Sequence, residues 1–473
     1  MTTTLRRTSH GRVGALSRRA GARRTAAAGT RRPVADTATP DSGIPEASGA
    51  PRVLVVGSGW RFTSGISYYT CRLTNALAEV TPTSALLMRQ LVPTFLYPGK
   101  DRVGQQVNDL AYGPSVAVFD GLDWFWGGSM RRARKFLVEQ RPEVLVLQWW
   151  TGAVLHSYLR LARLADKLGC KVVIEWHEVQ DTGEARIPGV ARYVTKAMKS
   201  LLRQVSGHVV HSQYDLQLLR RLYDLPDEKV TIAPHGPYDH HSPEVVVTGT
   251  ASDPVLSVPA EPLAQKDFIF LYFGIIRPYK GVEDLVAAFD LLPAEVRATS
   301  RLVLVGETWE GWNAPLQAVA ASPNRDRIDV VNRYVTDAEV AAHFAAADAV
   351  VLPYRRSSSS GPLHIAMSSG LPVVVTHVGG LVEAARDYEG THFVEPADPA
   401  GLAAEMAQLP QTRDRRFVDP HSWDYTVEAY GELLRRIGAR TWSLPAAPAI
   451  PKSAAAPIAL LSRADVVTPV TTA

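Results

Sequence analysis

Short uninterrupted apolar runs recur along this 473-residue chain, and most are followed by a loop and then a helical pattern. A short apolar run without polar alternation is typical of a strand buried on both faces of a parallel sheet. The runs that we assign to strands are 53–56, 144–147, 172–174, 209–210, 230–232, 268–273, 302–305, 328–331, 349–352 and 373–376. Strands that alternate with helices predict an α/β fold with doubly wound parallel sheets.

Helical periodicity fills the segments between these runs. Apolar residues recur at i, i+3, i+4 and i+7 in 282–292, which predicts an amphipathic helix there. Ser212 with Asp215 and Thr336 with Glu339 have the spacing of helix-capping residues. We therefore expect helices to begin directly after Ser212 and Thr336.

A change of composition divides the chain. Residues 240–266 are rich in proline and lack a helical period, which favours a linker or surface excursion. We expect two Rossmann-like domains, at 51–239 and 267–421, and a further helix within 422–440. Because ligands of doubly wound sheets bind beyond the carboxyl ends of the strands, the predicted site is a central cleft that both domains face.

The two ends of the chain differ from its body. Residues 1–50 and 441–473 lack apolar periodicity, and both are predicted to be disordered tails. Nine arginines and no acidic residue lie within 1–32, and without them the 47 acidic residues outnumber the basic ones. The body of the chain therefore gives no sign of nucleic-acid binding. We interpret 1–32 as a solvated arm, with contact to anionic lipid as the alternative.

Composition also constrains the compartment. Two cysteines, Cys71 and Cys170, exclude a disulfide framework and a cysteine-based zinc site, and we expect both to be buried, inert thiols in a reducing compartment. The N-terminal arm lacks the apolar stretch of a secretory signal. No apolar run approaches the ~18 residues that span a bilayer. These features predict a cytoplasmic protein, with peripheral attachment to the inner face of the membrane as the alternative.

The clearest candidate for ligand binding is the segment 274–281, which reads GIIRPYKG and joins a strand to a helix. Gly274 ends the strand, and Arg277 and Lys280 flank the start of the helix, where backbone amides favour anions. A diphosphate there would meet the forked guanidinium of Arg277 and the point charge of Lys280. The alternative is that both are solvated surface cations.

A serine-rich loop at 357–363 follows a later strand. Proline suits the first turn of a helix, where its missing N–H is not needed. We expect the hydroxyls and backbone amides of this loop to bind phosphate, with a flexible serine loop as the alternative. The residues assigned to it are Ser359, Ser360, Gly361, Pro362 and Leu363.

The first glycine loop does not fit a dinucleotide site. Gly57-Ser58-Gly59 begins like the fingerprint, but the third glycine would fall at position 62, which is Phe62. Ser64 and Gly65 stand just before a helix and can still approach a ligand closely. A plain strand–helix turn is the alternative.

Histidines in the first domain offer a polar contact. His177 follows the strand 172–174, where it can donate to or accept from a ligand in the cleft. A buried core histidine is the alternative, and we interpret His235 as structural. No metal site is expected, because the chain has no Asp-x-Asp, no H-E-x-x-H and no cysteine cluster, and the pair His240-His241 lacks a third ligand.

Taken in order, these motifs resemble those of GT-B fold glycosyltransferases of the retaining family 4 type (glycosyl transferases group 1), over roughly 52–440. Arg277 and Lys280 match the loop that binds the donor diphosphate in that family, and the terminal helix resembles the segment that crosses back onto the first domain. The other matching segments are Ser64-Gly65-Ile66, Trp176-His177-Glu178, Pro353-Tyr354, AMSSGLPVV at 366–374 and GGLVE at 379–383.

One family feature is missing. The family usually carries Glu-x7-Glu, whose carboxylates contact the transferred sugar and the nucleotide ribose. Here Ser357 and Ile365 stand at those positions. Some relatives carry a Ser-x-Ser-Gly loop instead, and this chain looks like a variant of that type.

The resemblance implies transfer of a hexose from a nucleotide-diphosphate sugar to an acceptor hydroxyl, on a glycan, a lipid-linked molecule or a small molecule, with anomeric retention. It also implies that no metal or other cofactor takes part and that the setting is cell-envelope polysaccharide biosynthesis. Arg277, Lys280 and the loop 359–363 would oppose charge on the leaving diphosphate, His177 would position the sugar or acceptor, and Ser64 and Gly65 would lie on the acceptor side. The alternatives are a non-catalytic nucleotide-sugar-binding or assembly protein of this fold, and an enzyme of other chemistry, such as a sugar epimerase.

Two segments raise the hypothesis of contact with an anionic membrane. One is the amphipathic helix expected at 190–205, and the other is the basic run 131–135 near the aromatic residues 124–126. An ordinary packed amphipathic helix is the alternative.

Overall fold

The computed structural model describes residues 50–60, 65–90, 110–123, 127–179, 190–239, 267–309, 311–413 and 415–442, without the side chains of 190–195. Ser64, the aromatic segment 124–126, the linker 240–266, and the terminal segments 1–49 and 443–473 lie outside the described residues.

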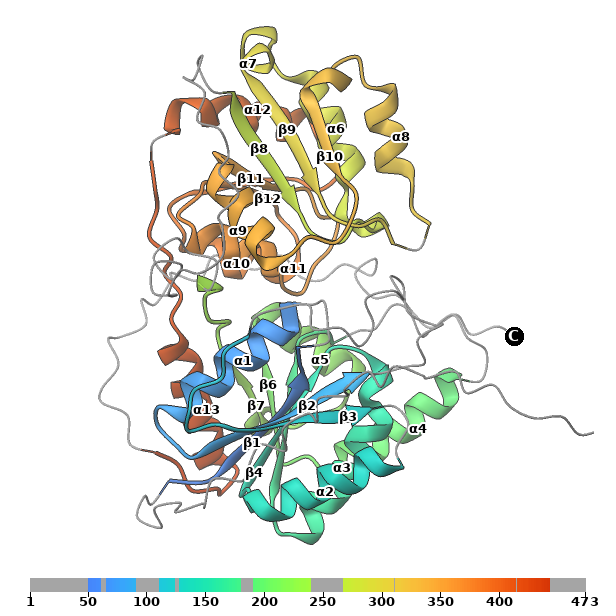
Figure 1. The fold of residues 1–473 in the computed structure, drawn as a ribbon, viewed down its shortest axis with the longest axis vertical. Coiled ribbons are helices and arrows are strands. Elements are labelled where there is room, and N and C mark those ends of the chain that lie inside the picture. Colours follow the sequence, from blue (N-terminus) through green and yellow to red (C-terminus); the bar gives the residue numbers. More distant parts are fainter. Residues whose placement is uncertain are drawn as a thin grey trace, which may run out of the picture. The chain divides into compact units, whose positions relative to one another are not determined.

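Seven parallel strands form the first sheet, in the order β3-β2-β1-β4-β5-β6-β7 (Figure 1). The strands are β1 Val53–Ser58, β2 Thr83–Gln90, β3 Ala117–Asp123, β4 Val144–Trp149, β5 Lys171–Trp176, β6 Gly207–Val210 and β7 Val230–Ile232. The helices that connect them are α1 Gly65–Ala78, α2 Gly128–Gln140, α3 Leu155–Lys167, α4 Val190–Leu202 and α5 Gln213–Leu222.

Both faces of the first sheet are buried, which is why its central strands read as unbroken apolar runs. In β1, Val53 and Val55 pack into one core with Tyr69 of α1. The alternate residues Leu54 and Val56 pack into a second core with residues of α2, α3 and α4. The helices therefore form a layer on each face of the sheet, with α2 against α3 and α3 against α4.

Six parallel strands form the second sheet, in the order β10-β9-β8-β11-β12-β13. The strands are β8 Phe268–Phe273, β9 Ser300–Val305, β10 Ile328–Val331, β11 Ala349–Leu352, β12 Val373–Thr376 and β13 Thr391–Val394. The helices are α6 Val282–Leu291, α7 Ala294–Ala298, α8 Ala314–Ala321, α9 Asp337–Ala346, α10 Gly361–Ser368, α11 Gly379–Ala385 and α12 Pro399–Gln408. Each sheet reverses its winding once, between β1 and β4 and between β8 and β11, so the predicted doubly wound class is confirmed.

The last described helix, α13 (Trp423–Arg436), packs on α1, β6 and β7 of the first sheet. Trp423 Nε1 donates to the carbonyl of Pro237 at 3.2 Å, and Thr426 Oγ1 donates to that of Pro234 at 2.6 Å. The chain that enters the second sheet after β7 thus returns to finish on the first. Among the described helices, none has the length and apolar character needed to cross a membrane.

Candidate functional site

The two loops singled out by the sequence lie next to each other in the second sheet. β8 and β11 are hydrogen-bonded neighbours, and the winding reverses between them. Gly274 follows β8, and a Cβ placed on it would lie 3.5 Å from Cγ of Pro362, which stands after β11. The two loops therefore meet beyond the strand ends at the reversal point, where doubly wound sheets bind their ligands.

A glycine holds the cationic turn against its neighbour. Gly281 has φ +60°, and a Cβ there would lie 2.2 Å from the carbonyl oxygen of Pro353. Only glycine accepts both the left-handed backbone and this close approach. The short turn Pro278–Lys280 is thus fixed against the loop that follows β11.

Lys280 is enclosed by aromatic rings. Its Nζ lies 3.5 Å from the ring centroid of Tyr354 and 5.1 Å from that of Tyr279. Burial lowers the pKa of Lys280 to about 7, an effect that Glu178 opposes and Arg277 reinforces. The ammonium is therefore a desolvated charge whose proton can be lost near neutral pH.

Arg277 lies at the start of the same turn, where its guanidinium carbon is 4.9 Å above the ring of Trp309. It also faces Tyr279, whose pKa is raised by burial and by Glu178 and lowered by Arg277. A third cation of this region, Arg355, is bound to Glu283 and Asp284 at 3.1 and 2.9 Å. Arg277, Lys280 and Arg356, whose guanidinium carbon lies 5.1 Å from the ring centroid of Tyr279, all place positive charge at this turn.

The serine loop is ordered by its own hydrogen bonds. Ser360 caps α10, and the backbone N–H of Leu363 donates to Ser360 Oγ at 3.4 Å and to its carbonyl at 3.1 Å. The Leu363 amide is therefore committed within the helix cap, whereas we expected it to face an anion. Ser357 Oγ donates to the carbonyl of Ser359 at 2.8 Å, and Pro362 has no N–H to offer.

His177 and Glu178 stand at the end of β5, in the first sheet. The His177 side chain is 3% exposed, and its Nε2 lies 3.6 Å from Oε2 of Glu175. Glu178 raises the pKa of Lys280 through its charge. The end of β5 therefore lies within electrostatic reach of the cationic turn.

Tyr238 joins a predicted residue of the first domain to one of the second. Its hydroxyl donates to the carbonyl of Gly65 at 2.8 Å, and its ring lies 3.0 Å from a Cβ placed on Gly361. Sequence reasoning missed this residue. The available signal is an aromatic side chain directly after the turn Pro234–Gly236 that ends β7.

A cluster of histidines continues from His177, and sequence reasoning missed it. His177 and His211 have ring centroids 4.8 Å apart, and His235 stacks on His364 at 4.1 Å. Burial lowers the pKa of His211 to about 4 and that of His364 to about 3, while His235 lies well below its usual value for the same reason. These three imidazoles are therefore neutral at pH 7.

Two carboxylates connect α5 with segments of the second sheet. Glu383 accepts hydrogen bonds from the backbone N–H groups of Gln213 at 2.7 Å and Tyr214 at 2.8 Å. Burial raises the pKa of Asp215 to about 7, although hydrogen bonds from Ser212 and Ser358 oppose the rise.

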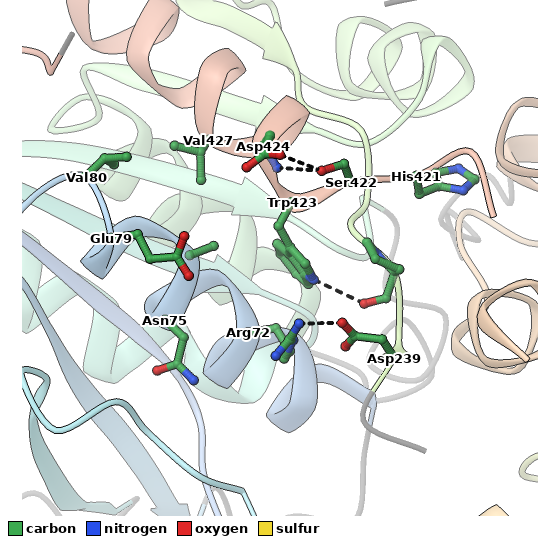
Figure 2. Close-up of a pocket in the computed structure, with 12 residues that line it drawn as sticks. Arg72, Asn75, Glu79, Val80, Asp239, His421, Ser422, Trp423, Asp424 and Val427 are labelled. Atoms are coloured by element: carbon green, nitrogen blue, oxygen red, sulfur yellow. Dashed lines mark hydrogen bonds and ion pairs between the residues drawn. The ribbon is translucent and has the colours of Figure 1, made fainter. Parts of the chain in front are cut away.

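A separate pocket of about 290 Å³ lies between α1 and α13 (Figure 2). Arg72 on one wall pairs with Asp239 at 2.6 Å, and Trp423 forms part of its lining. None of the predicted donor-binding or acceptor-side residues lines it, so we do not assign it to the candidate site.

Comparison with known proteins identifies the family of both halves. Residues 64–236 match the model of the glycosyl transferase 4-like domain, and residues 267–412 match that of glycosyl transferases group 1. Among solved structures, sucrose-phosphate synthase from Thermosynechococcus elongatus aligns with a TM-score of 0.53 and 16% identity, over 83% of this chain and 95% of that one. Anabaena HepE in complex with UDP aligns with a TM-score of 0.51 and 14% identity, over 82% and 95%.

Curated relatives are matched over shorter stretches. The D-inositol 3-phosphate glycosyltransferase of Salinispora arenicola is 29% identical over 38% of this chain and 45% of its own length. The O-antigen chain mannosyltransferase B of Escherichia coli is 26% identical over 46% and 55%. The chain thus spans about half the length of these relatives.

The two domain matches follow each other in the predicted order, one within the seven-stranded sheet and its helices and the other within the six-stranded sheet and its helices. The chain has the GT-B fold and belongs to the glycosyl transferases of group 1 with a 4-like N-terminal domain.

Proposed function

We propose that this chain transfers a hexose from a nucleotide-diphosphate sugar to an acceptor hydroxyl, with retention of anomeric configuration and without a metal ion. The observation that carries the proposal is the convergence of Arg277, Lys280 and the serine loop at the reversal point of the second sheet. Family membership supports the reaction class, and the HepE structure holds UDP.

In the proposed step, the bond between the sugar C1 and the diphosphate oxygen breaks as the acceptor oxygen bonds to C1. The acceptor proton passes to the leaving phosphate, so no protein base is needed. Negative charge grows on the diphosphate, and Arg277 and Lys280 oppose that charge more strongly in the transition state than before it. His177 and Gly65 would position the sugar or the acceptor.

The residues at the family's paired glutamate positions suggest a variant site. Ile365 is buried, with 6% of its surface exposed, and the Ser357 hydroxyl donates a hydrogen bond to the carbonyl of Ser359. We infer that neither supplies a carboxylate to the sugar or the ribose. The hydroxyl of Ser359 is the group that we propose in their place.

A donor screen tests the proposal. UDP, GDP and ADP sugars are added to the full chain, and thermal shift, donor hydrolysis and transfer to added acceptors are measured with and without EDTA. Lys280→Ala is expected to lower turnover about a hundredfold, as loss of one oxyanion donor does. Lys167→Ala, at an exposed site in the last turn of α3, is the matched control.

Two outcomes separate the rival functions. Donor binding without hydrolysis or transfer would favour a non-catalytic nucleotide-sugar-binding protein, and a changed sugar without an acceptor would favour an epimerase. Equal donor affinity and turnover in Lys280→Ala and the wild type would remove the proposal.

We also propose peripheral contact with anionic lipid through the outer face of α2, α3 and α4, at the inner face of the membrane. Exposed cations cover the three adjacent helices, and the exposed apolar side chains Val138 and Leu168 lie among them. The cations are Arg131, Arg132, Arg134, Lys135, Arg160, Arg163, Lys167, Lys196 and Lys199. Attraction to anionic lipid contributes ~1 kcal/mol for each cation near the surface, so this face should bind weakly and in a salt-sensitive way.

Co-sedimentation with phosphatidylglycerol vesicles tests the contact, with phosphatidylcholine vesicles as the neutral reference. Arg131→Glu with Arg134→Glu is expected to abolish binding, whereas Arg435→Glu, at an exposed position of α13, should not. Absence of wild-type binding at low salt would exclude the contact.

A further inference from the structure

Three potential metal ligands come together behind the end of β5. Glu175 and His177 flank Trp176 at the end of that strand, and His211 follows β6. One ligand atom from each lies within 4.8 Å of the others. Within the described residues, this is the one group of three or more histidine, cysteine or acidic side chains with such geometry.

The two imidazole nitrogens of this group are buried without hydrogen-bond partners. His177 Nε2 and His211 Nε2 have none, although the His177 side chain is only 3% exposed. His211 Nδ1 lies 3.0 Å from the carbonyl of Ala233, which can only accept, so Nδ1 carries the proton and Nε2 the lone pair. This is the orientation that a metal-binding imidazole takes when a backbone carbonyl fixes its ring.

Glu175 is held in a comparable way. Tyr69 OH donates to its Oε1 at 2.7 Å, and Gln148 Nε2 donates to its Oε2 at 2.9 Å. The Glu175 carboxylate is therefore fully buried and fixed by two neutral donors, and its Oε2 lies 3.6 Å from Nε2 of His177.

The spacing suits zinc after a small adjustment. Tetrahedral ligands at the usual Zn–N and Zn–O lengths lie roughly 3.4 Å apart. The Glu175 and His177 atoms are already 3.6 Å apart, so the main movement required is that of the His211 ring. His211 is half-buried, whereas Glu175 and His177 are buried, which leaves its side as the entry path.

We propose that Glu175, His177 and His211 bind a divalent transition-metal ion such as Zn²⁺ and that the bound ion inhibits the enzyme by occupying His177 Nε2. Two nitrogens and one carboxylate favour zinc over magnesium, which prefers oxygen ligands. Only the inhibitory consequence rests on the proposed function. The ion is an inhibitor and takes no part in the transfer step.

Direct metal titration tests the site. Untagged, chelator-treated full chain is titrated with Zn²⁺ against a competing dye, and with Co²⁺ while visible absorbance is recorded. We expect one tight site, no thiolate-to-cobalt band, and no competition by Mg²⁺. His211→Phe keeps an aromatic ring against Tyr69 and His177 and should lose the tight site.

Two further variants keep the test interpretable. His235→Phe replaces a buried imidazole of the same cluster that is not in the ligand group, and it should retain the tight site. Tyr69→Phe removes the hydrogen bond to Glu175 and should weaken Zn²⁺ binding about 10–100-fold. Circular dichroism of each variant verifies folding.

The outcomes divide cleanly. Equal Zn²⁺ binding in His211→Phe and the wild type, or no tight binding by the wild type, would overturn the proposal. If a donor and acceptor are found, micromolar Zn²⁺ should inhibit the wild type and spare His211→Phe. If the wild type binds Zn²⁺ tightly but the zinc-free protein shows no transfer activity, the metal site is supported and only the proposed function is rejected.

Discussion

The imidazole of His235 stacks on that of His364, with ring centroids 4.1 Å apart and planes 13° apart. His235 follows the last strand of the first sheet, and His364 lies in α10 of the second. Two imidazoles in this contact cannot both carry a proton without strong repulsion, and burial disfavours even one charge. Acid should therefore weaken this part of the molecule.

We predict that His364→Phe lowers the acid sensitivity of folding. The pKa of His364 is about 3 in the folded chain and near 6.5 when unfolded, so the unfolded chain binds a proton that the folded chain does not. The stability that depends on neutral His364 is present above pH 6.5 and is lost as the pH falls toward 3. Between pH 6 and pH 5, the free energy of unfolding of the variant should rise by about 1.4 kcal/mol relative to that of the wild type.

Urea denaturation at several pH values measures this difference in free energy of unfolding. His377→Phe, at an exposed position, serves as the control, and its difference from the wild type should not depend on pH. If the difference for His364→Phe is also independent of pH, protonation of the stacked rings does not affect stability.

Asp215→Asn should have the opposite pH profile. The pKa of Asp215 is raised by burial from 3.8 to about 7, so the folded chain holds a proton that the unfolded chain releases between those values. Wild-type stability from this group is present below pH 3.8 and is lost as the pH rises through 7. The side chain at position 215 cannot ionise in the variant. Its free energy of unfolding should therefore rise, relative to that of the wild type, by about 1.4 kcal/mol per pH unit between pH 5 and 7.

The same denaturation series, run at pH 5, 6 and 7, measures this effect. Asp166→Asn alters an exposed carboxylate and should stay parallel to the wild type. Parallel curves for Asp215→Asn would contradict the prediction.

Nucleoside diphosphate affinity should fall as the pH rises above 7. The pKa of Lys280 is lowered to about 7 by burial, so an increasing fraction of the free protein has a neutral amine above that pH. Affinity for the diphosphate should decrease up to tenfold per pH unit there, because binding requires the protonated form. Calorimetry with the diphosphate of the preferred base measures it, and Lys280→Arg, which stays charged, should bind with little pH dependence.

Glu383→Gln should destabilise the chain by about 1 kcal/mol. The carboxylate accepts the first backbone N–H groups of α5, and it adds a negative charge where the helix dipole is positive. Glu389→Gln, whose carboxylate pairs with Arg415 at an exposed site, is the matched control. Thermal or urea unfolding that ranks both variants alike would show that α5 does not depend on this contact.

The sequence predicted most of the interior strands because those strands are buried on both faces, but it missed β2, in which six of eight residues are buried. The capping expectations at Ser212 and Thr336 are confirmed by hydrogen bonds from the N–H groups of Asp215 and Glu339. The burial of Cys71 and Cys170 is also confirmed. These features depend on residues close in sequence, which is why a single chain reveals them.

The elements that sequence reasoning missed lack that local signal. β3 and β13 are edge strands with partly exposed side chains, and β3 includes Asp120 and Gly121, so neither forms an unbroken apolar run. The helices α2, α7, α8 and α12 were not assigned from the sequence either. Pattern alone cannot separate a half-exposed strand from a turn.

Most of the candidate site depends on tertiary contacts. Arg277 and Lys280 could be found because one loop carries both. The grouping of Glu175, His177 and His211 arises because β5 and β6 are neighbours, which places the residues at the ends of the two strands side by side. Strand order in the sheet decides that grouping, and spacing along the chain does not report it.

Glu143, just before β4, receives the backbone N–H of Arg52 at 3.4 Å and the guanidinium of Arg440, whose Nε donates at 2.7 Å. One carboxylate thus accepts hydrogen bonds from residues near both the beginning and the end of the described α/β body, because α13 returns to the first sheet. Topologically, the second sheet is an insertion within the first domain. A circular permutant that joins the chain near Arg440 to Arg52 through a short peptide, with new ends opened in 240–266, should keep both sheets intact.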